Sequence, residues 1–328
     1  MGPVSDTDAR WMNAAVALAA RGRGRTAPNP NVGCVLVRDG QVVGRGWTQP
    51  GGRPHAEAVA LAQAGEKSRD ATCYVTLEPC AHPSTRGPAC ADLLVSAGVA
   101  RVVAAVRDPD PRTDGAGFSR LADAGIEVVS DVGGETARRA MAGWLTRRKR
   151  GRPFVTLKLA MSLDGAVAMA DGSSQWITGP VARAHAHGER SRHEAILVGR
   201  DTWDADHPQL DVRLPGLEAR SPARVVLTSR PVEGSVVTIG APEEIAALPG
   251  DYLLVEGGAV TAAAFLRADL VDRLLLYRAP VLVGAGRSLP GFGLTDLAAA
   301  HGRWRLDDAR QLGVDRMEVY ERTRCLPA

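Results

Sequence analysis

Residues 54–80, PHAEAVALAQAGEKSRDATCYVTLEPC, hold a helix pattern and a strand pattern with a histidine at one end and a cysteine at the other. The run HAEAVALAQAG predicts a helix that begins at His55, and TCYVTL predicts a strand. That strand runs into Glu78-Pro79-Cys80, and a loop rich in Pro, Ser and Gly follows. The segment therefore predicts an α/β unit with His55 at the start of a helix and Cys80 at the end of a strand.

The chain on either side continues this pattern. A helix is expected from Asp6, as its N-cap, to about Arg21. Residues 32–47, VGCVLVRDGQVVGRGW, predict a β-hairpin that turns at Asp39-Gly40. Beyond the cysteine loop, the segments CADLLVSAG, RVVAAV, GFSRLADAG and IEVV alternate helix and strand, which favours a largely parallel sheet after the hairpin.

A basic stretch, RRKRGR at 147–152, separates the two halves and is expected to be a solvated connector. A second α/β pattern begins at Phe154, with helices expected over 180–192, 242–248 and 262–268. Its strands are expected in FVTLKLAMSLDG, AILVG, ARVVLTS, SVVTIG, YLLVEGG, RLLLYRAPVLVG and, last, residues 317–322. The predicted organisation is a first domain over 1–146, a basic linker over 147–153 and a second domain over 154–328.

Composition limits the class of protein. A length of 328 residues favours about two domains. With 40 basic and 37 acidic residues the net charge is +3, which excludes a chain dominated by a nucleic-acid-binding tail. No apolar run is long enough to span a membrane, and the first ten residues lack the apolar region of a secretory signal. Five cysteines, an odd number, favour a reducing compartment, so a cytoplasmic location is expected.

One histidine and two cysteines have the spacing of a catalytic zinc site. His55, Cys80 and Cys90 supply three ligands and leave a fourth position for water, whose pKa zinc lowers toward ~7. Glu57, two residues after His55, is placed to move protons between that water and a leaving amine. H-x-E followed by Pro-Cys and a further Cys is the signature of zinc-dependent nucleobase deaminases. The alternative is that His55 caps the helix and the cysteines are buried apolar residues.

Further motifs extend over both halves of the chain: NPNVGC (29–34), PHAE (54–57), TLEPC (76–80), DPDP (108–111), SLDG (162–165), SQWI (174–177) and VEGG (255–258). In this order they resemble the bifunctional deaminase–reductase family of riboflavin biosynthesis. The resemblance implies a cytidine-deaminase-like first domain and a dihydrofolate-reductase-like second domain, both α/β. It also implies zinc-dependent deamination of a phosphorylated ribosylaminopyrimidine, followed by NADPH-dependent reduction of its ribose to a ribityl chain.

The family pattern also assigns roles to residues. It implies deaminase substrate contacts at Asn29, Asp108 and Asp110. It implies cofactor contacts at Ala160, Trp176, Thr202, Asp206, Ser229, Gly258, Ala259 and Val260. It implies reductase substrate contacts at Lys158, Ser174, Arg190, Leu210, Arg213 and Glu256. Arginines suit a sugar phosphate, and Lys158 and Asp206 are candidates for assisting ring opening.

The sequence departs from the family pattern in four places. The Cys80–Cys90 loop is one residue longer than usual and contains His82, which is expected to be a polar loop residue. Ala116 replaces a basic residue, and Asp110 replaces an asparagine and adds a charge to the sugar pocket. Between Arg230 and Glu256 the family normally has two strands and a helix, whereas this sequence predicts only the strand SVVTIG and a short helix, so one strand is expected to be absent or merged.

Other functions stay open at this point. The second domain is alternatively a drifted module that only binds nucleotide or mediates oligomerisation. The protein is alternatively another zinc deaminase, acting on cytidine, guanine or tRNA, or a non-catalytic binding protein. The favoured partners are a small-molecule substrate and further copies of the chain, with neither nucleic acid nor membrane. Four histidines, His185, His187, His193 and His207, are expected to be ordinary helix and loop residues, and Cys34 and Cys73 to be core thiols.

Overall fold

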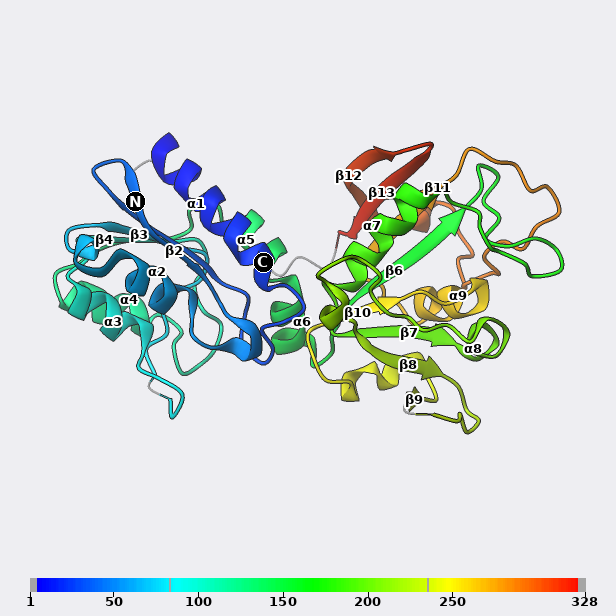
Figure 1. The fold of residues 1–328 in the computed structure, drawn as a ribbon, viewed down its shortest axis with the longest axis horizontal. Coiled ribbons are helices and arrows are strands. Elements are labelled where there is room, and N and C mark those ends of the chain that lie inside the picture. Colours follow the sequence, from blue (N-terminus) through cyan, green and yellow to red (C-terminus); the bar gives the residue numbers. More distant parts are fainter. Residues whose placement is uncertain (1–4, 83, 235, 324–328) are drawn as a thin grey trace. The chain divides into compact units, whose positions relative to one another are not determined.

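A computed structural model describes residues 5–82, 84–234 and 236–323 of the chain (Figure 1). It divides into two compact units, residues 1–145 and 146–328. Both units have helices packed on a β-sheet, so the predicted α/β class is confirmed. No helix among the described residues combines the length and the apolar character needed to cross a bilayer. Cys325 lies outside the described residues.

Unit 1 is built on a five-stranded sheet with the order β2-β1-β3-β4-β5. Strands β1 and β2 form the predicted antiparallel hairpin, and β1 also pairs antiparallel with β3. The pairs β3–β4 and β4–β5 are parallel, as the alternation of helices and strands predicts. The strands are β1 (Gly33–Arg38), β2 (Gln41–Trp47), β3 (Thr72–Val75), β4 (Arg101–Ala104) and β5 (Glu127–Val129).

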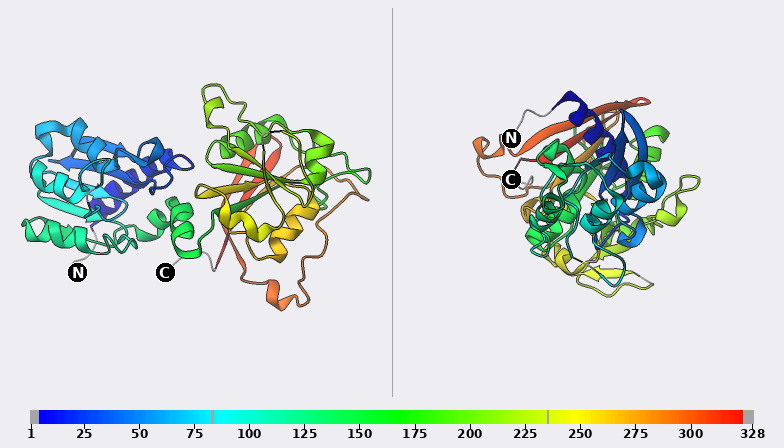
Figure 2. Two further views of the ribbon diagram at one scale, coloured as in Figure 1. Left: turned by 90° about the horizontal axis from the view of Figure 1, so that it is seen from below. Right: turned by 90° about the vertical axis from the view of Figure 1, so that its left-hand side faces the viewer.

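Helices cover both faces of this sheet (Figures 1 and 2). Helix α1 packs on β1 and beside α5, whereas α2 packs on β1 and β2 and beside α3. The N-cap of α1 is Ser5 rather than the expected Asp6, because the Ser5 hydroxyl accepts a hydrogen bond from the backbone N–H of Asp8. The helices are α1 (Asp6–Ala19), η1 (Ala20–Gly22), η2 (Pro50–Gly52), α2 (Ala56–Ala64), η3 (Gly65–Ser68), α3 (Cys90–Ala97), α4 (Ala116–Asp123), α5 (Gly134–Ala140) and α6 (Ala142–Arg150).

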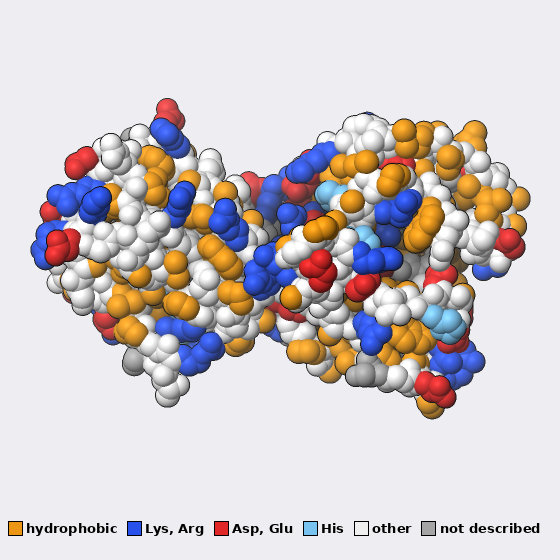
Figure 3. All heavy atoms as spheres, viewed as in Figure 1, with side chains coloured by type: hydrophobic (Ala, Val, Ile, Leu, Met, Phe, Trp, Pro, Cys, Tyr) orange, Lys and Arg blue, Asp and Glu red, His pale blue; other side chains and the backbone are white. Residues whose placement is uncertain are grey.

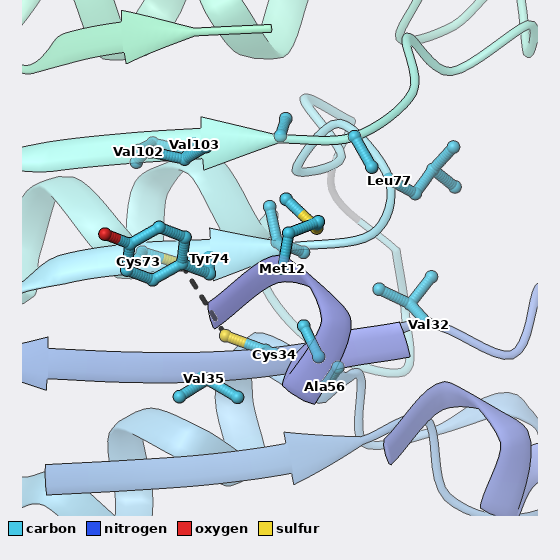
Figure 4. Close-up of a cluster of buried hydrophobic side chains, with 14 of the residues drawn as sticks. Met12, Val32, Cys34, Val35, Ala56, Cys73, Tyr74, Leu77, Val102 and Val103 are labelled. Atoms are coloured by element: carbon cyan, nitrogen blue, oxygen red, sulfur yellow. Dashed lines mark hydrogen bonds between the residues drawn. The ribbon is translucent and has the colours of Figure 1, made fainter. Parts of the chain in front are cut away.

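The core of unit 1 is made mostly of small and medium-sized side chains, with Tyr74 and Trp144 as large ones (Figure 4). Cys34 on β1 and Cys73 on β3 are fully buried there, with their sulfurs 3.6 Å apart, so the prediction of two core thiols is confirmed. Helix α2 approaches the sheet closely at Gly46, where a Cβ atom would lie 2.2 Å from the carbonyl oxygen of Ala56. Glycine at position 46 therefore allows α2 to pack closely against the sheet.

Unit 2 is built on an eight-stranded sheet with the order β12-β13-β11-β6-β10-β7-β8-β9. The strands from β11 to β9 are parallel neighbours, and the β12–β13 hairpin adds antiparallel to β11. The strands are β6 (Phe154–Met161), β7 (Ala195–Gly199), β8 (Ala223–Leu227), β9 (Val237–Ile239), β10 (Tyr252–Val255), β11 (Arg273–Arg278), β12 (Trp304–Leu312) and β13 (Asp315–Arg322).

The described helices of unit 2 include the three that the sequence predicts, α7, η5 and α9, and three that it does not, α8 and the short η4 and η6. Between Arg230 and Glu256 the described residues form β9, η5 and β10, so this region retains two short strands. The helices are α7 (Pro180–Arg190), α8 (Arg200–Asp206), η4 (Glu218–Arg220), η5 (Pro242–Ala247), α9 (Ala259–Arg267) and η6 (Ala298–Ala300).

The basic stretch 147–152 is partly the solvated segment that its charge predicts: residues 148–151 are exposed, whereas Arg147 is half-buried and Arg152 is buried. Its first four residues end helix α6. The Arg147 guanidinium donates to the carbonyl oxygens of Leu248 and Gly250, and buried Arg152 pairs with Asp272 at 2.6 Å. Backbone carbonyls and a buried carboxylate of unit 2 therefore neutralise part of this charge. Elsewhere on the face drawn in Figure 3, acidic and basic side chains are interspersed.

Candidate active sites

Three potential metal ligands converge in unit 1. His55 is the N-cap of α2, Cys80 follows β3, and Cys90 is the first residue of α3. His55 Nδ1 lies 3.3 Å from Cys90 Sγ and 3.7 Å from Cys80 Sγ. All three ligand atoms lie within 4.8 Å of one another, and the described residues contain no other such group of His, Cys, Asp or Glu.

The chemistry of these donors fits zinc. An imidazole nitrogen and two sulfurs are preferred zinc ligands, and three of them leave a position for water. The hydrogen bond with the Cys90 side chain is the largest cause that lowers the pKa of Cys80, and the hydrogen bond with His55 adds to it. Together they outweigh burial and lower the pKa of Cys80 to about 4. The Cys80 thiolate is therefore available at neutral pH. Convergence on His55 argues against the alternative in which both cysteines only fill the core.

Two further residues surround the cluster. Glu57 lies in the first turn of α2 and is 3% exposed. Burial raises the pKa of Glu57 above its ordinary value. On the other side, Asn29 Nδ2 lies 3.0 Å from His55 Nε2 and donates to the carbonyl oxygen of Gly52 at 2.8 Å. Asn29 therefore fixes the orientation of the imidazole.

The loop between β4 and α4 brings a buried carboxyl close to the same cluster. Burial raises the pKa of Asp108 to about 7, and the charge of Cys80 contributes to the shift. The neighbouring Asp110 is paired with Arg112 at 2.6 Å, which compensates the charge that this residue was expected to add. His82 Nδ1 lies 3.2 Å from the Thr113 hydroxyl, outside the ligand cluster, as expected of a polar loop residue.

One residue of this site was not recognised from the sequence. Glu78 belongs to the quoted TLEPC motif, yet only the structure gives it a role. Its buried carboxylate accepts hydrogen bonds from four backbone N–H groups of the β4–α4 loop and α4. The available signal was an acidic residue directly before Pro79-Cys80 at the end of an apolar strand.

A buried ionic cluster lies on the sheet of unit 2. Glu256 follows β10, and its carboxylate accepts a hydrogen bond from Arg190 Nε at 2.8 Å and lies 3.5 Å from Lys158 Nζ. Burial alone would raise the pKa of Glu256, but these two cations outweigh it and lower the pKa to about 2. Arg190 also donates to the carbonyl oxygen of Asp211, so the protein itself holds its guanidinium in place.

Several candidate cofactor residues lie near the carboxyl ends of the parallel strands, where α/β sheets bind ligands. A Cβ atom at Gly258, the N-cap of α9, would lie 3.5 Å from the Thr202 hydroxyl on α8, so the segments after β10 and β7 are neighbours. Asp206 at the end of α8 accepts from the Gln175 amide at 3.3 Å. Ala160 is on β6, Ser229 follows β8, Ala259 and Val260 begin α9, and Trp176 is 64% exposed beside Arg183.

The remaining candidates of unit 2 have different settings. Leu210 is buried in an apolar cluster with Val198 and Val226, so its side chain serves the core. Arg213 is largely exposed, with its Nε 3.5 Å from Asp211 Oδ1. Ser174 lies in the exposed segment before α7. Three of the histidines have hydrogen-bond partners within unit 2: His185 bonds to Tyr277, His187 to Asp211, and His193 to both Glu189 and Thr156. None of them joins a group of metal ligands in the described part of the chain.

Comparison with known proteins connects both units to one family. Residues 5–106 match the cytidine and deoxycytidylate deaminase zinc-binding region, and residues 153–317 match the RibD C-terminal domain. The riboflavin biosynthesis protein RibD of Haemophilus influenzae is 40% identical, with 95% of this chain and 96% of that protein covered. The chain belongs to the RibD family. The RibD of Escherichia coli is also 40% identical, over 94% of this chain and 97% of its own length.

Solved RibD structures agree with this assignment. The RibD of Acinetobacter baumannii is 37% identical with a TM-score of 0.85, over 97% of this chain and 99% of that one. A deaminase/reductase from Thermotoga maritima is 31% identical with a TM-score of 0.86, over 96% and 99%. The Haemophilus alignment has 362 positions, more than the 328 residues present here, so relatives carry segments that this chain lacks.

Family membership defines the overall activity. The chain is a bifunctional enzyme of riboflavin biosynthesis, with a zinc-binding deaminase domain of the cytidine-deaminase type and a RibD reductase domain. Its cofactors are Zn²⁺ and NADPH. Because the second half matches the RibD C-terminal model, the alternatives of a different zinc deaminase and of a non-catalytic binding protein are not supported.

Proposed function

We propose that the first reaction removes the 2-amino group of a diaminopyrimidinone that carries a ribosylamino 5′-phosphate. His55, Cys80 and Cys90 would hold the zinc, which would lower the pKa of a water molecule toward neutral. The observation that carries this proposal is the convergence of the three ligand atoms within 4.8 Å beside the buried Glu57.

Each neighbouring residue has a part in this step. Glu57 takes the proton of the attacking water and returns it to the leaving amine. Asn29 orients His55, and together with Asp108 and Asp110 it contacts the substrate. The hydrogen bond between Asn29 and His55 and the position of Asp108 near Cys80 support these assignments.

The second reaction reduces the ribose of the deaminated product to a ribityl chain, with NADPH as the source of hydride. The residues that would hold the cofactor lie near the carboxyl ends of β6, β7, β8 and β10 or in the segments that follow them: Ala160, Trp176, Thr202, Asp206, Ser229, Gly258, Ala259 and Val260. Substrate residues are Lys158, Ser174, Arg190, Leu210, Arg213 and Glu256. Lys158, which stands beside the carboxylate of Glu256, and Asp206 are the groups that assist opening of the sugar ring.

The limits and setting of the two domains belong to the same proposal. The deaminase domain occupies residues 1–146 and the reductase domain 154–328, with the basic segment 147–153 between them. The enzyme works in the cytoplasm on small-molecule substrates, as a homo-oligomer, without a nucleic acid or membrane partner.

The test uses the purified full chain with the undeaminated substrate. We expect about one zinc per chain, release of ammonia and substrate-dependent oxidation of NADPH. Glu57→Gln should lower ammonia release by about 10²–10⁴-fold, the usual effect of losing a general acid–base group. The same variant should still oxidise NADPH when the deaminated substrate is supplied. Ammonia release without NADPH oxidation in the unaltered enzyme would contradict the reductase assignment.

A further inference from the structure

A single buried side chain connects the metal ligands of unit 1 to the loop expected to meet the substrate. Glu78 is 2% exposed and stands two residues before Cys80. Its Oε2 accepts from the N–H groups of Asp108 at 3.2 Å and Gly115 at 3.0 Å. Its Oε1 accepts from those of Gly117 at 2.9 Å and Phe118 at 3.3 Å.

The carboxylate occupies the first turn of α4. The free N–H groups at the start of a helix attract anions, and here Glu78 supplies that anion from within the fold. At Gly117 a Cβ atom would lie 2.0 Å from the carbonyl oxygen of Pro79 and 3.0 Å from Glu78 Oε1. The first turn of α4 can therefore approach the turn of residues 78–80 only with glycine at position 117.

Because of these contacts, the turn of residues 78–80 fixes two parts of the site at once. Cys80 lies at its end, and Asp108 is attached through its own N–H to Glu78. The side chain of Asp108 in turn accepts from the N–H of Asp110 at 2.9 Å, which continues the ordered loop. Displacement of the Glu78 carboxylate would move Asp108 relative to the cysteine ligand.

We infer that Glu78 is a positioning residue for deamination: it holds the Asp108 loop in register with the metal ligands and so determines how tightly the pyrimidine substrate is bound. The inference rests on the proposed function, because it takes Asp108 as a substrate contact. Glu78 itself touches neither the zinc ligand atoms nor the substrate in this role.

The test compares Glu78→Gln with unaltered enzyme in ammonia release from the undeaminated substrate. Gln keeps the size of the side chain, but its amide nitrogen cannot accept from two of the four N–H groups. We expect KM to rise roughly tenfold or more, as loss of charged hydrogen bonds implies, with a smaller change in kcat. Zinc content and the reductase activity should stay unchanged. Glu66→Gln, an exposed carboxyl of the same unit, is the matched control.

Two further variants complete the test. Asp108→Asn combined with Glu78→Gln should raise KM little more than either change alone, because both act through one contact. Glu78→Asp keeps the charge and should restore part of the loss; it also carries the test if Gln prevents folding, seen as loss of zinc. Unchanged KM in Glu78→Gln, or additive effects with Asp108→Asn, would overturn the inference. Absence of ammonia release from unaltered enzyme would instead refute the proposed function.

Discussion

At the scale of residues, buried carboxyls in the two units have opposite electrostatic settings. Burial raises the pKa of Glu57 and of Asp108 in unit 1, where no cation is paired with either carboxyl among the described contacts. In unit 2 the cations of Lys158 and Arg190 overcome burial and lower the pKa of Glu256. A raised pKa suits a carboxyl that exchanges protons near neutral pH, and a lowered pKa suits a carboxylate that stays charged and holds cations in place.

Glu256→Gln should impair reduction and leave deamination intact. The change leaves Lys158 and Arg190 without their buried counter-charge, a loss that typically costs about 3–5 kcal/mol. We expect NADPH oxidation with the deaminated substrate to fall by at least about tenfold, whereas ammonia release is unaltered. Exposed Glu243→Gln is the control. Equal loss of both activities would contradict a role confined to unit 2.

Asp8 should make the stability of unit 1 depend on pH. The hydrogen bond from Arg101, with Arg101 Nη1 to Asp8 Oδ1 at 2.7 Å, outweighs burial and lowers the pKa of Asp8 below 3.8. A lowered pKa means that the stabilisation is present above the unfolded pKa and is lost as pH falls through the folded value.

The measurement is urea unfolding of Asp8→Asn against unaltered enzyme. At neutral pH the variant should be less stable by about 1.5–3 kcal/mol, the contribution of hydrogen bonds to a charged group. The difference should shrink below pH 3.8. A difference that stays constant from neutral to acidic pH would refute this account.

At the scale of elements, apolar patterns predicted the strands that are buried and missed those that are not. Segments such as AILVG and YLLVEGG become β7 and β10 in the core of unit 2. Strand β12, WRLDDARQL, escaped prediction because it is mostly exposed and so lacks a regular apolar period. Helix α8, RDTWDAD, has no buried residue and was missed for the same reason.

The candidate sites, too, could be predicted only in part from the sequence. The zinc ligands could be predicted because three unusual residue types have a characteristic spacing. The contact of Arg190 with Glu256 could not, because it joins residues 66 positions apart and depends on how α7 packs on the sheet. Family motifs named both residues, but only the structure reveals that they bind each other.

Gly46→Ala should disturb the zinc site by displacing helix α2 from strand β2, on which it packs. A Cβ atom there would lie 2.2 Å from the Ala56 carbonyl oxygen and 2.8 Å from Val59 Cβ, so the helix must shift away from the sheet. Overpacking of this kind costs about 1–3 kcal/mol, and the shift moves His55 and Glu57. We expect weaker zinc binding and slower ammonia release. Gly291→Ala, which meets no atom within 4 Å, should change neither.

At the scale of the whole molecule, the two reactions draw on separate sets of residues. All deaminase candidates lie within unit 1, between Asn29 and Asp110, and all reductase candidates lie within unit 2, between Lys158 and Val260. Each unit also has its own sheet and its own apolar core. The chemistry of one site therefore needs no side chain from the candidates of the other.

Removal of zinc should separate the two activities in the intact chain. A chelator takes the metal from thiol and imidazole ligands of unit 1, so ammonia release should stop and return when zinc is added back. Oxidation of NADPH with the deaminated substrate should continue at its original rate, because the reductase candidates include no ligand of the metal. Starting from the undeaminated substrate, the same chelated enzyme should oxidise no NADPH, since its reductase substrate is no longer made. If NADPH oxidation with the deaminated substrate also ceased and recovered only with zinc, the reductase would depend on the metal centre. The assignment of deamination to unit 1 alone and reduction to unit 2 alone would then be wrong.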